Sequence, residues 1–232
     1  MGVIQYRSKR HYWCKLKREK EKSELIRVSE IRVFNLEGAI RGARNPMNSW
    51  AKSDSVYVEG EYVIGENDLA LLKRLVVAGS DERKFMRQIL VSLDITAPLY
   101  WWKEFDTYKV GTTANSCSTM HKIHSRDLSK GDFSIDNMTE PALQLLGAII
   151  DFMNHNRRMY VASNNKSYWH NIIKILPTSY NQKRTITLNY EVLRNIYHAR
   201  RHHKLDEWHT LCDEIEKMPY SELITMEAKV AK

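Results

Sequence analysis

The pattern of hydrophobic and polar positions predicts short strands near the start of the chain. Residues 26–28 and 31–34 have the composition of strands, and residues 56–58 and 62–64 predict a hairpin with Gly60 at its turn. Apolar residues then change their spacing, and longer amphipathic segments follow. The pattern therefore indicates strands that alternate with helices along the chain.

Residues 85–96 mix helical and strand spacing of apolar side chains. This mixture predicts a helical turn that passes into a strand near Leu90. Pro98 is expected to end the element, because the preceding residue, Ala97, is pushed toward extended geometry.

Helical spacing predicts three longer helices. Asn67 and Asp68 are expected to cap the first and Gly79 to stop it, proline within residues 139–141 suits the first turn of the second, and Asn189 is expected to cap the third. Their apolar stripes are Leu69, Leu72, Leu75 and Val76, then Leu143, Leu146, Ile149, Ile150 and Met153, and last Leu193, Ile196, Tyr197, Leu205, Trp208, Leu211 and Ile215.

The second of these helices has the strongest apolar stripe, and we expect it to be the best core helix of the protein. The third is expected to run unbroken to Met218, just before Pro219. Short strands interleaved with amphipathic helices predict an α/β or α+β fold.

The composition is that of a chain able to bury a sizeable core. Of 232 residues 43% are hydrophobic, with 9 Gly and 5 Pro, which excludes disorder and collagen-like structure. The net charge of +8 is unevenly spread: residues 7–22 hold eight basic and two acidic side chains, which leaves +2 elsewhere. We therefore expect a basic tail over residues 1–22 and a single α/β domain over residues 23–232.

The basic tail has two interpretations. Tyr6, Tyr12 and Trp13 lie among its lysines and arginines, as aromatic residues do in proteins that bind nucleic-acid strands without sequence preference. A solvated, partly helical tail is the commoner fate of such a charge run. Nucleic acid is thus a candidate partner through residues 1–22, and both interpretations stay open.

The sequence also bears on the cellular compartment. Its longest apolar stretch, residues 142–153, is far shorter than the roughly 20 residues that span a bilayer, so we expect no membrane insertion. The basic start is not followed by an apolar segment, which argues against a secretory signal. Cys14, Cys117 and Cys212 are dispersed and predict no disulfide framework, so the cytoplasm is the simplest compartment.

Strong catalytic motifs are absent from the sequence, including a Walker loop, a zinc-protease helix and a nucleophile elbow. His198 and His202 have the spacing of helical metal ligands, but Arg201 and Lys204 beside them would repel a cation. We favour a basic, anion-facing helix surface there.

Cys117, His121 and His124 lack a fourth ligand, so no metal site is predicted. Cys117 is also a weak candidate for a nucleophile, because no cation is predictably close enough to lower the pKa of its thiol.

The most unusual segment, residues 97–122, places a cluster of aromatic residues before a run of small hydroxyl and amide side chains. Such a run suits a loop that binds a phosphate or a pyrimidine edge. An aromatic core strand over residues 99–105, followed by an ordinary polar loop, explains the composition equally well.

The order of several segments narrows the choice. The sequence IKILP at residues 173–177 precedes TLN at residues 187–189, and a helical stretch with Arg200 and the pair EW at residues 207–208 follows. This order resembles the C-terminal half of the flavin-dependent thymidylate synthases, where VLP precedes TxN, a helix with a leucine–arginine pair, and QWEI. Upstream, APLY at residues 97–100 and the polar loop after it are similar to the family's strand and nucleotide loop.

The resemblance implies a fold, a reaction and partners. The family has an α/β domain with a curved central sheet, forms a homotetramer with active sites between subunits, and holds FAD. It methylates dUMP with a carbon unit from methylenetetrahydrofolate and a hydride from flavin that NADPH reduces. Such a site needs cationic groups for the phosphate and the polarised pyrimidine.

Site residues follow from the resemblance position by position. Arg200 matches the helix arginine that contacts the nucleotide, so it is the implied catalytic residue, and Asn189 matches the asparagine near the flavin. Lys109 is expected to bind the substrate together with Arg200. The hydroxyl groups expected to donate to the phosphate belong to Thr112, Ser116 and Ser118.

The family signature RHRxxSxxxxSxR is not intact in this chain. Thr107 and Thr119 replace its first and last arginines, Tyr108 replaces its histidine, and Lys109 keeps charge without the bidentate fork of arginine. The family's GHxxxxEH segment finds no histidine within residues 79–88. The chain is therefore interpreted as a divergent relative.

Two hypotheses remain. The first is an enzyme that methylates dUMP or a related pyrimidine nucleotide. The second is a relative without catalysis, which sequesters a nucleotide or binds nucleic acid through its basic tail.

Overall fold

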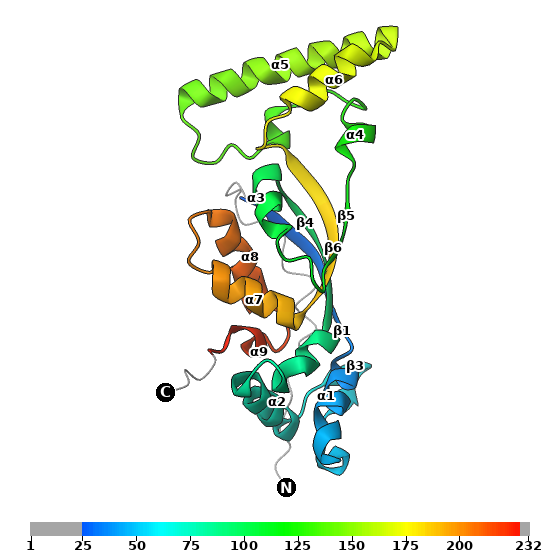
Figure 1. Ribbon diagram of the computed structural model, residues 1–232, viewed down its shortest axis with the longest axis vertical. Helices are drawn as coiled ribbons and strands as arrows, with labels where there is room; N and C mark the ends of the chain where they lie inside the picture. Colours follow the sequence, from blue (N-terminus) through cyan, green and yellow to red (C-terminus); the bar gives the residue numbers. More distant parts are fainter. Residues whose placement is uncertain (1–24, 228–232) are drawn as a thin grey trace.

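The computed structural model describes residues 25–227. Its centre is a four-stranded antiparallel sheet in the order β1-β4-β6-β5 (Figure 1). The strands are β1 (Arg27–Phe34), β4 (Leu90–Pro98), β5 (Thr113–Ser116) and β6 (Asn181–Asn189).

Strict alternation along β4 creates one apolar face of the sheet. Val91, Leu93 and Ile95 are fully or almost fully buried, whereas Ser92 and Asp94 between them are half-buried. The register pairs Leu93 with Ile186 of β6, which extends the apolar face to the next strand. The mixed α and β fold predicted from the sequence is confirmed, as are the strand that begins near Leu90 and its end at Pro98.

Helices pack on this apolar face in a single hydrophobic cluster. Trp101, Trp102 and Trp208 are fully buried there, and the ring centroids of Trp101 and Trp208 lie 4.6 Å apart. The helices that surround them are α3 (Leu99–Phe105), α7 (Tyr190–Arg200), α8 (Asp206–Glu216) and α9 (Glu222–Thr225).

One of the two interpretations of the aromatic segment, and the expectation for the last long helix, are wrong. The aromatic stretch 99–105 is a helix, because strand β4 ends at Pro98 and the chain must turn to bury both tryptophans on the sheet. The unbroken helix from Asn189 to Met218 is instead α7 and α8, joined by a turn after Arg200. That turn lets Trp208 pack on Trp101, which a straight helix could not do.

The N-terminal part combines a hairpin with two helices and three 3-10 segments. The predicted hairpin is confirmed, with Tyr57 paired to Tyr62, and so is the stop of α2 at Gly79. These elements are α1 (Leu36–Arg44), the 3-10 turns η1 (Asn45–Met47) and η2 (Trp50–Lys52), β2 (Val56–Val58), β3 (Glu61–Val63), α2 (Glu66–Ala78) and η3 (Glu82–Gln88).

The predicted capping of α2 by Asn67 and Asp68 is wrong, because Gly65 is the N-cap and both residues lie inside the first turn. Asp68 is fully buried and accepts hydrogen bonds from Arg44 at 2.5 Å and from the Ser55 hydroxyl at 2.5 Å. A carboxylate that is satisfied inside the protein is not available to cap a helix.

The expectation that the helix after residues 139–141 is the best core helix is also wrong. The helix α5 (Glu140–Ser163) packs with α6 (Lys166–Ile175) in a second cluster, away from the sheet's main core, and Leu143 and Ile149 are only half-buried. In Figure 1 this pair lies across one end of the sheet. The short elements α4 (Thr119–Lys122) and η4 (Lys130–Asp132) precede it.

Within residues 25–227, no helix combines the length and the apolar character that a membrane crossing requires. The expected basic tail, residues 1–22, lies outside the described residues.

Candidate functional site

A loop between α3 and β5 lies against helix α7. Lys109 and Thr112 form its turn, with the Thr112 amide donating to the Lys109 carbonyl at 3.2 Å. Gly111 has a φ of 75°, a region that side-chain-bearing residues rarely adopt. A Cβ at Gly111 would stand 2.9 Å from Asn189 Nδ2 and 3.3 Å from Val192 Cγ2. The absent side chain is what lets the loop approach the helix.

Asn189 joins the sheet to α7. It is the last residue of β6, and its Oδ1 accepts a hydrogen bond from the Val192 amide at 3.0 Å, which confirms the predicted N-cap. Because Oδ1 is engaged in the cap, Nδ2 is the donor that faces Gly111.

Arg200 stands at the other end of α7 in an aromatic and acidic setting. Its Nε donates to Tyr108 Oη at 2.9 Å and its Nη1 donates to Glu104 Oε2 at 2.9 Å. The guanidinium carbon lies 4.7 Å from the centre of the Trp208 ring. Glu104 Oε2 also accepts from Trp208 Nε1 at 3.2 Å and lies 3.4 Å from His203 Nε2. Glu104 and its partners hold Arg200 in place.

The loop carries two of the predicted site residues, and it lies beside the helix whose ends hold two more. Lys109 is exposed. Thr112 is half-buried, and its Oγ1 is itself buried without a hydrogen-bond partner among the described residues. Asn189 and Arg200 mark the two ends of the helix. An exposed cation, an unpaired hydroxyl and a carboxamide donor are groups that can bind the polar parts of a nucleotide.

Ser116 and Ser118 lie farther along, next to strand β6. Ser116 pairs with Arg184 on the edge of the sheet, and Ser118 caps α4 by accepting from the His121 amide at 3.1 Å. Within residues 25–227 neither contacts Arg200, so the folded chain by itself does not unite all the predicted substrate-binding residues. Cys117 between them is exposed.

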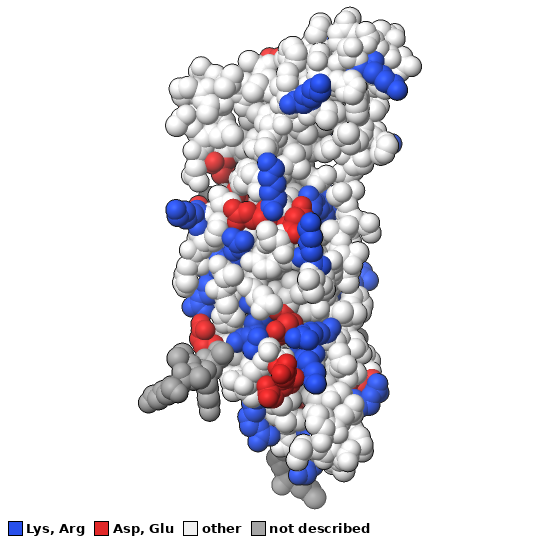
Figure 2. Space-filling model, viewed as in Figure 1, with Lys and Arg blue, Asp and Glu red and all other residues white. Residues whose placement is uncertain are grey.

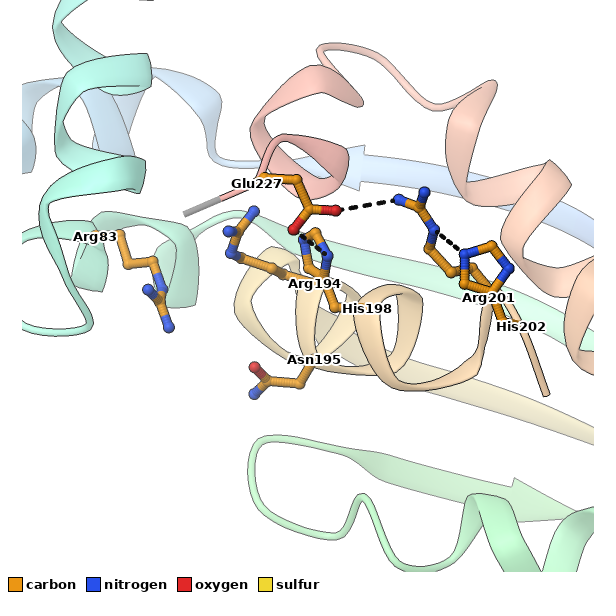
Figure 3. A pocket seen from close by; sticks show the side chains of 7 residues that line it. All are labelled: Arg83, Arg194, Asn195, His198, Arg201, His202 and Glu227. Atoms are coloured by element: carbon orange, nitrogen blue, oxygen red, sulfur yellow. Dashed lines mark hydrogen bonds and ion pairs between the residues drawn. The ribbon is translucent and has the colours of Figure 1, made fainter. Parts of the chain in front are cut away.

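A cavity of about 390 Å³ opens on another side of α7, and sequence reasoning missed most of it (Figure 3). Figure 3 shows Arg194, His198 and Arg201 gathered near Glu227, which lies 3.4 Å from Arg201 and 3.6 Å from His198. The lining residues are Arg83, Arg194, Asn195, His198, Arg201, His202 and Glu227.

The cavity is basic, although part of its charge is already engaged. Arg83 donates twice to Glu191, at 3.0 and 3.1 Å, and Arg194 donates to the carbonyls of Ile224 and Met226. Burial, and then the charge of Arg194, lower the pKa of His198, so this imidazole is mainly neutral at pH 7. The basic helix surface predicted from the HARRHH run supplies His198, Arg201 and His202, whereas no local pattern pointed to Arg83.

Charge on the visible surface of the molecule is mixed. Figure 2 shows lysine and arginine side chains interspersed with acidic ones along the face that it presents. This agrees with the near balance of charge outside the tail. Among residues 25–227, no three His, Cys, Asp or Glu side chains are grouped as metal ligands.

The fold of the chain is similar to that of several solved structures. The flavin-dependent thymidylate synthase ThyX from Helicobacter pylori, solved with FAD and dUMP, superposes over 86% of this chain and 98% of its own, with a TM-score of 0.64 and 16% identity in one structure and 0.61 and 16% in another. The chain has the fold of the flavin-dependent thymidylate synthases.

A second relative of the fold is the UMP/dUMP methylase PolB from Streptomyces cacaoi, solved with 5-Br dUMP. It matches with a TM-score of 0.60 and 14% identity, over 83% of this chain and 88% of its own. No protein-family model matches the sequence, and no curated protein matches it either. The chain thus shares this fold with proteins to which it is only 14–16% identical in sequence.

Proposed function

We propose that this protein is a divergent methyltransferase that acts on dUMP or a related pyrimidine nucleotide. The observation that supports this proposal most is the position of the loop carrying Lys109 and Thr112 beside α7, between Asn189 and Arg200, within a fold that covers 98% of ThyX. Two proteins with this fold were solved with dUMP or its 5-bromo derivative.

In this proposal Arg200 holds the nucleotide, and its Nη2 is the donor that its present partners leave for the ligand. Lys109 supplies an exposed positive charge for the phosphate, and the hydroxyl of Thr112 donates to it. The Ser118 oxygen accepts from the His121 amide, and within residues 25–227 its O–H has no acceptor, so it can donate to the phosphate. A homotetramer with sites between subunits would bring Ser116 and Ser118 of one chain to α7 of another.

The residues beside α7 fit the charged part of a dinucleotide such as FAD. Arg201, His202 and Arg83 line a cavity whose size is typical of ligand pockets, and cations there suit a diphosphate. Asn189 is the proposed contact to the flavin. When bound, reduced flavin would supply the hydride, with NADPH as reductant and methylenetetrahydrofolate as carbon donor.

The absorption spectrum of the purified protein, with and without dUMP, tests the proposal. A flavin spectrum that dUMP perturbs is the expected result, together with a raised melting temperature on addition of FAD. Arg201→Gln should weaken FAD binding, whereas Arg158→Gln, on the exposed surface of α5, serves as the matched control. A colourless protein that neither FAD nor dUMP stabilises would refute the proposal.

The second candidate function is nucleotide binding without turnover. Glu104 neutralises Arg200, and Thr107 stands where the family has an arginine, so the site has fewer free cations than catalysis in the family uses. Binding of dUMP without product formation would support this candidate. Deletion of residues 1–22 tests whether the tail binds nucleic acid, because any nucleic-acid affinity that survives the deletion cannot come from the tail.

A further inference from the structure

The carboxylate of Glu104 lies beside Arg200, where it would repel a phosphate that binds there. Its Oε2 is 2.9 Å from Arg200 Nη1, and the side chains are 35% and 18% exposed, so the pair lies at the edge of the folded protein, open to a ligand. Trp208 Nε1 and His203 Nε2 converge on the same oxygen. Glu104 therefore collects the donors that an anionic ligand would otherwise use.

Local charges are close to balance once these contacts are counted. Glu104 pairs with Arg200, and Asp106, on the same segment, pairs with Arg184 at 2.8 Å. Lys109 is exposed and forms no ion pair among the described residues. A phosphate monoester carries about −1.5 to −2 at pH 7, more than a single lysine neutralises.

We propose that Glu104 is a specificity-determining residue, which makes the nucleotide site discriminate against a doubly charged phosphate next to Arg200. Glu104 accordingly lowers the affinity for a nucleoside monophosphate more than it lowers the affinity for a pyrimidine ligand with a singly charged phosphodiester or with no phosphate. This inference rests on the proposed function, since it requires that the ligand reaches Arg200.

Glu104→Gln tests the inference with little change of shape. The glutamine Oε1 can still accept from Arg200 and Trp208, so the variant removes charge and keeps the contacts. Coulomb's law with an effective dielectric of about 20 predicts roughly a 50-fold change in affinity when one of two unit charges about 7 Å apart is removed. Solvent screening reduces this factor to about 10-fold for each unit of ligand charge.

Three probes with different charge at the 5′ position make the test decisive: dUMP, its 5′-phosphate methyl ester and deoxyuridine, each measured by calorimetric titration on wild type and variant. Glu104→Gln should raise affinity about 30- to 100-fold for dUMP and about 10-fold for the ester, and leave deoxyuridine unchanged, since the electrostatic free energy scales with ligand charge. The matched control Glu222→Gln removes an exposed carboxylate that pairs with Lys73 and should alter none of the three.

Each outcome separates the inference from the function on which it rests. Equal affinities of wild type and Glu104→Gln for dUMP, or a loss of affinity in the variant, would overturn the inference and leave the proposed function intact. The same gain for all three probes would also overturn it, because a charge effect cannot act on deoxyuridine. Failure of both proteins to bind any probe would overturn the proposed function together with the inference.

Discussion

Replacement of Gly111 by alanine should separate the loop from helix α7. The positive φ of 75° costs an alanine about 1–2 kcal/mol, because its Cβ crowds the backbone. The new Cβ would also stand 2.9 Å from Asn189 Nδ2. To relieve that contact, Asn189 must shift and weaken its cap on the Val192 amide, which is worth about 1 kcal/mol. The two effects together predict a loss of about 2–3 kcal/mol in the free energy of unfolding.

Gly147→Ala is the matched control. It introduces the same methyl group inside helix α5, where a Cβ meets nothing within 4 Å. Because alanine is the better helix former, this variant should gain about 0.5–1 kcal/mol. Urea denaturation at pH 7 measures both variants, and opposite signs are expected. A Gly111→Ala protein as stable as wild type, with unchanged affinity for dUMP, would refute the reasoning that the loop depends on this close approach.

Two further predictions concern the buried Asp68 and the cysteines. Asp68→Asn should cost about 3–5 kcal/mol in urea denaturation, because it leaves the buried Arg44 without its carboxylate. Burial alone would raise the pKa of Asp68, but hydrogen bonds from Ser53, Ser55 and Arg44 outweigh it and hold the pKa below 3.8. The stabilisation that the Asp68 carboxylate provides should therefore be complete above pH 3.8 and disappear as the pH falls through the lower pKa of the folded state. If acid lowered the stability of wild type and of Asp68→Asn to the same extent, this prediction would be wrong. In a Cys14→Ser background, exposed Cys117 should react with a disulfide reagent in the native state. Cys212 is buried, and burial raises the pKa of its thiol to about 12, so it should react only after unfolding. Equal reaction rates of the two cysteines in the native protein would contradict this.

Local patterns were sufficient for much of the fold. Alternation along β4 and the proline at its end depend on neighbouring residues only, so the strand and its limit could be predicted. The cap at Asn189 is equally local, since its Oδ1 reaches an amide three residues later. The order of these segments also carried the resemblance to the thymidylate synthase fold.

Long-range packing decided what the local pattern could not. The apolar spacing continues from α7 into α8, yet the chain turns after Arg200 because burying Trp208 against Trp101 outweighs a continuous helix. For the same reason the aromatic segment before the loop is a helix on the sheet, although its composition suited a strand equally well.

The sequence by itself determined which residue types are available to the site, above all Arg200, Asn189 and Lys109. Only the tertiary structure decided which of these charged groups are paired with other side chains. Glu104 and Arg200 are 96 positions apart, and no spacing rule relates them, yet the fold brings Oε2 and Nη1 to 2.9 Å. An ion pair depends on distance in space and not on distance along the chain, so the charge that a ligand meets in this site is a property of the fold.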